Sequence, residues 1–175
     1  MGAAAVDLRQ YVRDIPDFPK PGILFKDITP LLSSPVAFAA SIDQFAQKFQ
    51  GRGINLIAAA EARGFIFGAP LAIQMNVGFV PIRKPGKLPH ATIAVAYQLE
   101  YGVDKLEVHT DAFQPGQRVL LIDDVLATGG TMRACGDLVE STGATVVAAA
   151  FLLELGFLGG RARLEPREVV SLITY

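Results

Sequence analysis

Apolar residues along the chain fall into short continuous runs that alternate with helical repeats. The run 54–60 (INLIAAA) is followed by a helical pattern that starts near Gly64 or Phe65, and then by a second apolar run, 77–82. Short apolar runs separated by a helix are typical of βαβ units, in which the two strands are parallel. This segment is therefore predicted to form one such unit.

The same order recurs nearer the C-terminus. Strands are predicted over 118–123 and 145–152, joined by a helix over 130–142, and a last strand is predicted over 169–174. Because successive βαβ units share one sheet, the predicted fold class is α/β, with a central, mostly parallel sheet flanked by helices.

The N-terminal part of the chain departs from this alternation. Closely spaced prolines exclude a helix over most of 14–30, so we predict an ordered, non-regular arm there. Ser34 and Pro35 are then typical of a helix start, and the apolar spacing that follows predicts a helix as far as Phe49.

A second departure covers 83–110, between the two βαβ units. Apolar and polar residues alternate around its centre, and glycine or proline lies at both flanks. So long an excursion from a compact domain is typical of a hairpin or a lid over a binding site. We predict such a lid over about 83–108.

The composition favours one cytoplasmic domain. With 175 residues, 51% of them hydrophobic, the chain can bury one substantial core, so 1–175 are predicted to form a single domain. The net charge of −1 gives no general attraction to nucleic acid or to a membrane. No apolar run reaches the roughly 18 to 20 residues that span a bilayer. A lone Cys135 cannot form an internal disulfide, which favours a reducing compartment, and it is most simply a buried packing residue.

The segment 119–131 (VLLIDDVLATGGT) carries the clearest chemistry. An apolar strand stops at Asp123 and Asp124, at the edge of a parallel sheet where ligands usually bind. Once the strand ends, the backbone bends and both carboxylates can reach one ligand. Carboxylates accept hydrogen bonds from hydroxyl groups, so we predict that the two acids bind the 2′ and 3′ hydroxyls of a ribose.

The loop that follows the two acids suits a phosphate monoester. Gly129 and Gly130 allow close approach of the backbone, Thr128 and Thr131 supply hydroxyls, and the helix start offers free N–H groups. Neither a Walker A pattern nor GxGxxG is present. The acids and the loop from Ala127 to Thr131 are together predicted to bind a ribose 5-phosphate.

Five blocks of the sequence resemble the type I phosphoribosyltransferase family, and within it the adenine phosphoribosyltransferases. They are, in chain order, FPKPGILFKDITPLL, EARGFIFGAPLA, IRKPGKLP, YQLEYG and VLLIDDVLATGGTM. The resemblance covers nearly the whole chain. It implies the type I phosphoribosyltransferase fold, with a small base-binding hood to which an N-terminal arm, about 1–33, contributes, and a mobile lid loop.

The resemblance also implies an activity, transfer of the 5-phosphoribosyl group from phosphoribosyl diphosphate (PRPP) to N9 of adenine in purine salvage. The products would be AMP and pyrophosphate, and Mg²⁺ would be held mainly by PRPP and water, without a direct protein ligand. The family further suggests a homodimer. Two alternatives stay open: a transferase for another purine, such as xanthine, and a non-catalytic regulator that senses PRPP.

The family places the pyrophosphate at the ends of the first two strands. From the residues alone, two alternatives stay open for each group of cations. Arg63, at a helix start, either binds an anion or is an ordinary surface cap. The cations that follow residue 82 either form a binding site or belong to the solvated surface. The resemblance implies a pyrophosphate site made of Glu61, Ala62, Arg63, Arg83, Lys84 and Lys87. It also implies that Arg63 is catalytic and that the first two of these residues are joined by a cis peptide. Ala62 replaces a serine that is more frequent in the family.

Glu100 in YQLEYG matches the catalytic glutamate of the family's lid. A carboxylate there accepts a proton as the base attacks, orients the ring, or is simply solvated. Tyr97 and Tyr101 shield the site from water or pack within the lid. His90 and His109 are far apart in the sequence on presumed loops, so no histidine-rich metal site is predicted, and His90 is assigned no role.

The resemblance assigns the purine to GILFKDI. Phe25 offers a flat apolar face, and the backbone of Leu24 and Lys26 can hydrogen-bond to the edge of the base. Lys26 stands where the family frequently has arginine. Leu155 matches a residue that packs on the other face of the base, but a core leucine at a strand end fits the pattern equally well.

Overall fold

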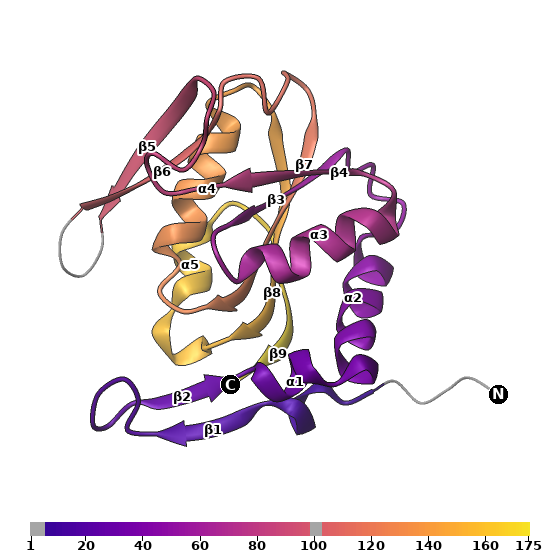
Figure 1. Ribbon diagram of the computed structural model, residues 1–175, viewed down its shortest axis with the longest axis vertical. Coiled ribbons are helices and arrows are strands. Elements are labelled where there is room, and N and C mark those ends of the chain that lie inside the picture. The colour runs from indigo at the N-terminus through magenta and orange to yellow at the C-terminus, as the bar shows by residue number, and fades with distance from the viewer. Residues whose placement is uncertain (1–5, 99–102) are drawn as a thin grey trace. The chain divides into compact units, whose positions relative to one another are not determined.

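The computed structural model describes residues 6–98 and 103–175 of the chain (Figure 1). The chain forms two compact units, Met1–Gln44 and Phe45–Tyr175, and helix α2 (Pro35–Phe49) runs from the first into the second. The Ser34 hydroxyl caps this helix by accepting the Ala37 N–H at 3.2 Å, which confirms the predicted start. The single domain over 1–175 stays a prediction.

In the first unit, the segment predicted as a non-regular arm instead contains an antiparallel hairpin. The elements of this unit before α2 are η1 (Leu8–Tyr11), β1 (Arg13–Pro16), β2 (Leu24–Asp27) and α1 (Thr29–Ser33). The prediction is wrong because the prolines avoid the ladder. Pro16 ends its strand, and Pro19 and Pro21 lie in the connection, where no ladder N–H is needed. The Gly22 N–H donates to Asp17 Oδ1 at 2.7 Å and closes that connection.

A five-stranded parallel sheet forms the centre of the second unit. Its order is β4-β3-β7-β8-β9, and every neighbouring pair is parallel. The strands are β3 (Leu56–Ala60), β4 (Gly78–Ile82), β7 (Arg118–Leu126), β8 (Thr145–Glu154) and β9 (Val169–Thr174). The predicted α/β class with a mostly parallel sheet is confirmed.

Helices cover both faces of this sheet. Ala59 and Ile122 lie against α3 (Gly64–Met75), whereas Ala58 and Leu121, one residue earlier on the same strands, belong to a buried cluster with α4 (Gly130–Glu140). Because neighbouring side chains in a strand point to opposite faces, the two helices lie on opposite sides. The short elements η2 (Gly156–Leu158) and α5 (Gly160–Leu164) connect β8 to β9.

The strand predicted to stop at the two acids continues beyond them. Strand β7 runs to Leu126, and its ladder with β8 pairs Val125 with Leu153 and Leu126 with Glu154. The predicted bend directly after Asp124 is therefore wrong. The reason is that β8 is itself longer than predicted and its apolar run supplies ladder partners past the acids.

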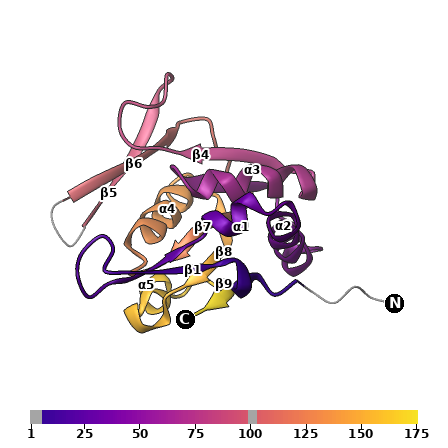
Figure 2. The same ribbon diagram turned by 60° about the horizontal axis from the view of Figure 1, so that its bottom comes forward.

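The predicted hairpin between the two βαβ units is present. Strands β5 (Thr92–Gln98) and β6 (Val103–His109) are antiparallel, and Figures 1 and 2 both show them beside α4. Leu106 and Val108 of β6 join the buried cluster under that helix. An antiparallel bridge between Arg83 and Glu107 ties the base of the hairpin to the end of β4. Whether the hairpin acts as a lid stays a prediction.

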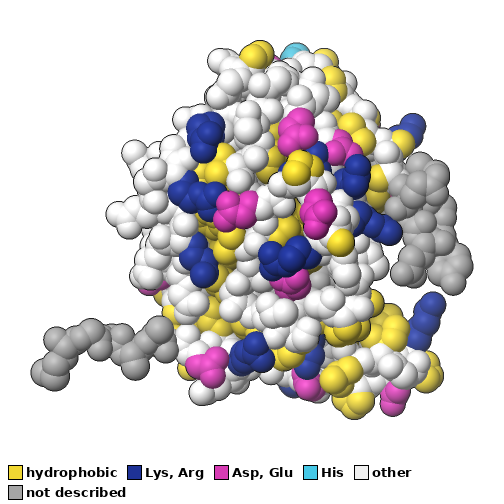
Figure 3. All heavy atoms as spheres, turned by 180° about the vertical axis from the view of Figure 1, so that it is seen from behind, with side chains coloured by type: hydrophobic (Ala, Val, Ile, Leu, Met, Phe, Trp, Pro, Cys, Tyr) yellow, Lys and Arg dark blue, Asp and Glu magenta, His cyan; other side chains and the backbone are white. Residues whose placement is uncertain are grey.

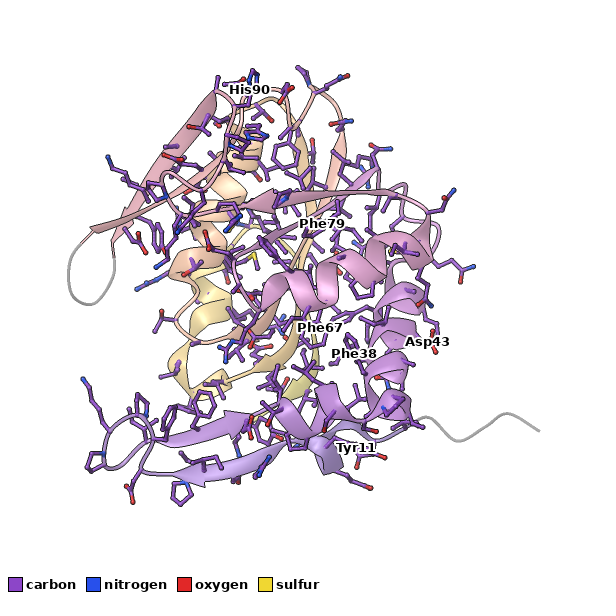
Figure 4. The ribbon with its side chains drawn as sticks, viewed as in Figure 1. Tyr11, Phe38, Asp43, Phe67, Phe79 and His90 are labelled. Atoms are coloured by element: carbon purple, nitrogen blue, oxygen red, sulfur yellow. The ribbon has the colours of Figure 1, made fainter. Side chains whose placement is uncertain are left out.

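Large apolar side chains stabilise the second unit. Phe45, Phe67 and Phe151 are fully buried, and each such side chain contributes about 1.5–3 kcal/mol relative to exposure to water. Phe67 of α3, labelled in Figure 4, meets the Phe45 ring edge to face with 6.4 Å between centroids. Cys135 is also fully buried, as predicted. Within the described ranges, no helix is long and apolar enough to cross a membrane.

Candidate active site

The two acids of β7 lie at the carboxyl end of the sheet, where α3 begins. Asp124 is only 3% exposed, and its Oδ2 lies 2.8 Å from Nε of Arg63, the residue before α3. This ion pair lacks hydrogen-bond geometry, so Oδ2 is a buried acceptor without a donor among the residues that the structure describes. Such an oxygen is suited to accept a hydrogen bond from a ligand hydroxyl.

Burial and a neighbouring carboxylate influence the ionisation of Asp123. Burial, followed by repulsion from the Asp124 carboxylate, raises the pKa of Asp123 well above the ordinary range of an aspartate. The Asp124 N–H, which donates to Asp123 Oδ1 at 2.9 Å, opposes this shift. Asp123 therefore holds a proton more readily than an isolated aspartate, until a donor or a cation arrives.

The loop from Ala127 to Thr131 joins β7 to α4 and lines a pocket. Asp123, Met132 and Phe151 line the same pocket, so the structure brings Asp123 and all five predicted phosphate-loop residues together. Gly129 has φ +81°, and a Cβ there would lie 2.7 Å from the Gly160 carbonyl oxygen. Only glycine fits this turn, which leaves the backbone N–H groups at the start of α4 open to a ligand.

Sequence analysis missed Gly160, the first residue of α5, which supports the phosphate loop. A Cβ on Gly160 would collide with the Ala127 carbonyl oxygen, so the loop and α5 pack backbone against backbone. The paired glycines in FLGGR were the available signal. They lie about 30 residues after the loop, and no spacing rule connects the two segments.

The predicted pyrophosphate residues cluster at the ends of β3 and β4. Glu61 Oε1 accepts the Lys84 N–H at 2.5 Å and lies 3.3 Å from Arg83 Nε. The Lys84 N–H, then the Arg83 guanidinium, hold the pKa of Glu61 below its usual range despite partial burial, and Lys87 adds to the effect. Arg63 differs from these cations because it pairs with Asp124. The cis peptide expected at Glu61–Ala62 is present.

The residues predicted to contact the purine lie in both units. In the first unit, Leu24 is 49% exposed, the Phe25 ring meets Phe18 edge to face, and Lys26 Nζ pairs with Asp14 at 2.7 Å. In the second unit, Leu155 follows β8, and its N–H donates to the Leu126 carbonyl at 2.9 Å. Their roles toward a base stay predictions. Glu100 and Tyr101 lie outside the described residues.

The two histidines are far apart in the sequence but close in space, and His109 is the last residue of β6 instead of lying on a loop as predicted. The rings of His90 and His109 stack edge to face with 5.8 Å between centroids, and the His90 N–H donates to His109 Nε2 at 3.3 Å. The hairpin register, which pairs Thr92 of β5 with His109 of β6, brings them together, and Figure 4 places His90 next to β5. In the part of the chain that the structure describes, no three His, Cys, Asp or Glu side chains form a metal-binding group.

Cationic and anionic groups are thus arranged locally at one edge of the sheet. On the face shown in Figure 3, basic and acidic side chains are interspersed rather than gathered into one basic patch. The sheet edge combines hydroxyl acceptors on β7, an open backbone loop after it, and cations at the ends of β3 and β4. This arrangement suits a polyol that carries a phosphate at one end and a second anionic group at the other.

Comparison with known proteins agrees with this chemistry. The family model described as "Phosphoribosyl transferase domain" matches residues 28–172. The adenine phosphoribosyltransferase of Symbiobacterium thermophilum is 58% identical over 170 residues, which is 97% of this chain and 100% of that protein.

Solved structures give the same result. The crystal structure of adenine phosphoribosyltransferase from Thermoanaerobacter pseudethanolicus has a TM-score of 0.92 at 55% identity, with 96% of this chain and 98% of that chain covered. The Trypanosoma brucei enzyme, crystallised with AMP, pyrophosphate and ribose-5-phosphate, has a TM-score of 0.87 at 30% identity, with 95% of this chain and 78% of that chain covered. The chain therefore belongs to the phosphoribosyl transferase domain family and, within it, to the adenine phosphoribosyltransferases.

Proposed function

We propose that this protein transfers the 5-phosphoribosyl group of PRPP to N9 of adenine and releases pyrophosphate and AMP. The observation that carries the proposal is the sheet edge at which the β7 acids, the 127–131 loop and Arg63 converge. Relatives that are more than half identical over nearly the whole chain are adenine phosphoribosyltransferases, which supports adenine as the base. These comparisons give no support to a xanthine-type transferase or to a non-catalytic sensor.

The ribose 5-phosphate part of PRPP is proposed to lie along the end of β7. Asp123 and Asp124 accept hydrogen bonds from the 2′ and 3′ hydroxyls, and the loop of Ala127, Thr128, Gly129, Gly130 and Thr131 binds the 5-phosphate. The buried Asp124 oxygen without a donor supports the first assignment. The glycine-dependent turn before α4 supports the second, because its open N–H groups and the helix dipole favour an anion.

The diphosphate is proposed to lie at the ends of β3 and β4. As the bond from the anomeric carbon to the leaving oxygen breaks, negative charge grows on the diphosphate and must be neutralised. Arg63 serves this purpose as the catalytic cation, and Arg83, Lys84 and Lys87 assist it. Glu61 and Ala62 complete the loop. Glu61 supports the assignment because its contacts hold Arg83 and the Lys84 backbone in place.

The base is proposed to stack on Phe25, with its edge against the backbone of Leu24 and Lys26. Leu155 is proposed to contact the base as well, and Glu100 to orient the ring or accept its proton. These assignments rest on the family resemblance of their sequence blocks. Holding adenine close to the anomeric carbon replaces an encounter in solution by a reaction within one complex, which lowers the barrier.

Mg²⁺ is proposed to enter with PRPP, held by the oxygens of that substrate and by water. When bound, it would neutralise charge on the diphosphate. The residues fit a cation of this kind, since the crowded Asp123 and Asp124 carboxylates supply negative charge and one Asp124 oxygen has no donor. The role of this chain's own residues is then to hold the sugar and to exclude other orientations of it.

A homodimer in the cytoplasm is proposed as the working state. Helix α3 supports self-association because its surface is largely apolar. Ile73 is 82% exposed, Phe65, Ile66 and Pro70 are only half-buried, and the helix flanks the edge strand β4. Exposed apolar patches of this kind are typical of protein interfaces. The single buried cysteine supports a reducing compartment.

A base-competition assay tests the proposed function. With PRPP and Mg²⁺, AMP formation from adenine is expected to exceed nucleotide formation from guanine, hypoxanthine or xanthine by orders of magnitude. Equal or preferential use of another base would refute the specificity. Binding of PRPP without turnover of any base would instead identify a sensor.

A further inference from the structure

A chain of polar contacts joins the end of β4 to the β5–β6 hairpin. Asp104 lies opposite Tyr97 in the hairpin register. Its Oδ2 accepts the Tyr97 hydroxyl at 3.4 Å and pairs with Lys84 Nζ at 3.3 Å, while its Oδ1 accepts the Lys105 N–H at 2.8 Å. Sequence analysis predicts no role for Asp104, and for Tyr97 it predicts only shielding of the site or packing.

The groups around Asp104 keep its carboxylate ionised. The Lys105 N–H, followed by Lys84, holds the pKa of Asp104 below its usual range, so its carboxylate is ionised at neutral pH. Burial raises the pKa of Tyr97, so its phenol is protonated at neutral pH and donates to Asp104.

Lys84 is therefore held at two points. Its backbone N–H donates to Glu61, and its ammonium pairs with Asp104. A lysine side chain has a long flexible stem, and holding it in one place before the ligand arrives removes part of the entropy lost on binding. The ammonium has three donors, so it can keep Asp104 and still donate to an anion.

We propose that Asp104 is a positioning residue that holds Lys84 ready for the diphosphate, and that the Tyr97 hydroxyl holds the Asp104 carboxylate in turn. The inference rests on the proposed function, because it takes Lys84 as a diphosphate ligand. It deepens that function by assigning the placement of one diphosphate ligand to two hairpin residues, Tyr97 and Asp104, that are not themselves proposed to bind the substrate.

The expected effect is moderate. The Lys84 side chain is 56% exposed and that of Asp104 is 24% exposed, and ion pairs so accessible to water are weak. Asp104→Asn is therefore expected to lower kcat/KM for PRPP about threefold to tenfold and to leave KM for adenine within about twofold. Asp111→Asn, the same change at an exposed position just after β6, is the matched control and is expected to have no effect.

A double-mutant cycle with Lys84→Met tests whether Asp104 acts through Lys84. In the Lys84→Met background, Asp104→Asn is expected to change kcat/KM for PRPP less than about 1.5-fold, because the group it positions is gone. An equal loss in both backgrounds would overturn the proposal and assign Asp104 a purely structural role. A gain in kcat/KM in Asp104→Asn would overturn it too, because Asp104 would then withhold Lys84 from the substrate.

Tyr97→Phe tests the link from Tyr97 to Asp104. It removes the phenol oxygen and is expected to raise KM for PRPP about twofold to fivefold without changing KM for adenine. A parallel rise in both KM values, or no change in either, would contradict the link. Tyr11→Phe, on η1, is the matched control. If Asp104→Asn does not fold, Asp104→Glu replaces it and is expected to stay within about threefold of wild type because it keeps the charge.

Failure of this inference is distinguishable from failure of the proposed function. The wild-type protein in the same assay tests the function, since it must form AMP. If it does not, the four proteins of the cycle are compared by calorimetric titration with PRPP and Mg²⁺. A PRPP affinity lowered by Asp104→Asn only when Lys84 is present supports the inference, and an affinity independent of Lys84 overturns it.

Discussion

Two strand-to-helix junctions at the same edge of the sheet are built alike but carry opposite chemistry. Both α3 and α4 begin with glycine after a three-residue connection from the carboxyl end of a parallel strand. The junction after β3 contributes Arg63 and gathers Arg83 and Lys84 around Glu61, whereas the loop after β7 is uncharged and follows two acids.

The difference matches the two anionic groups of PRPP. A phosphate monoester that stays bound through the reaction is served by backbone N–H groups, which carry no net charge and require a glycine turn. A leaving diphosphate gains charge in the transition state, so cationic side chains that are held in position serve it better. The Arg63–Asp124 pair joins the two junctions and places the cationic one beside the sugar-binding acids.

The largest expected effect is at the turn of the neutral junction, which is the uncharged loop between β7 and α4. Gly129→Ala places a Cβ 2.7 Å from a backbone oxygen at φ +81°, so the loop must rearrange. We expect at least about a hundredfold loss of AMP and PRPP affinity by calorimetry. Gly116→Ala is the control, since Gly116 has φ +83° but open space around it. Equal losses in the two variants would show that the loop needs no close approach.

Removing the Asp124 charge, which joins the two junctions, is expected to have a smaller effect than the change at Gly129. Asp124→Asn leaves Arg63 without its buried partner and weakens an acceptor for the ribose hydroxyls, so kcat/KM for PRPP is expected to fall about thirtyfold to a hundredfold. Asp137→Asn also removes an aspartate from an arginine pair but lies on α4 away from the loop. A comparable loss in Asp137→Asn would mean that the effect is not local.

The cationic junction is expected to tolerate change better, because several cations share its task. Glu61→Gln removes the charge that gathers Arg83 and Lys87 but can still accept the Lys84 N–H. We expect KM for PRPP to rise about fivefold to tenfold, with KM for adenine unchanged. Glu165→Gln, at an exposed position, serves as the control. An effect on adenine alone would contradict the assignment of this junction to the diphosphate.

The smallest expected effect is a pH dependence that belongs to the acidic strand end alone. Burial and Asp124 raise the pKa of Asp123, so the free protein holds a proton there above about pH 4, where an ordinary aspartate has lost it. Ribose hydroxyls donate to the ionised form. PRPP affinity is therefore expected to increase by a few fold as pH rises through the raised pKa, with proton release on binding.

Asp123→Asn is expected to abolish that proton release, because an amide does not titrate. Titrations in two buffers of different ionisation enthalpy measure it directly. The linkage has a second consequence for the free protein. Since the folded state keeps a proton that the unfolded state loses, Asp123 makes the free energy of unfolding decrease as pH rises across the same window. Proton uptake on binding would contradict the assignment.

Most of the sheet could be predicted from the sequence because its strands are buried on both faces. Runs such as VLLI and AAAFLL have few alternatives to a parallel strand between helices, and the predicted bounds of β9 are those observed. The β1–β2 hairpin could not be predicted in the same way. Its strands have only four residues each, and β1 ends in a proline, so the local sequence does not reveal the pairing of Ile15 with Phe25.

The chemistry of the neutral junction was predictable because its residues are contiguous in the chain. The contact that supports it was not, since Gly160 reaches the loop only through the fold, as Asp104 reaches Lys84 at the cationic junction. The same limit applies to the Arg63–Asp124 pair, whose partners are 61 positions apart and meet because β3 and β7 are neighbours in the sheet. Sequence alone indicated that both groups bind ligand, but not that they bind each other.

Calorimetric titration with AMP, 2′,3′-dideoxy-AMP and adenosine tests the central claim most directly, because each analogue lacks one of the two groups that the end of β7 is proposed to hold. AMP is expected to bind, the dideoxy analogue about tenfold to a hundredfold more weakly, and adenosine more weakly still. If the dideoxy analogue or adenosine binds as tightly as AMP, then the acids do not hold the diol or the glycine loop does not hold the phosphate, and the account is wrong.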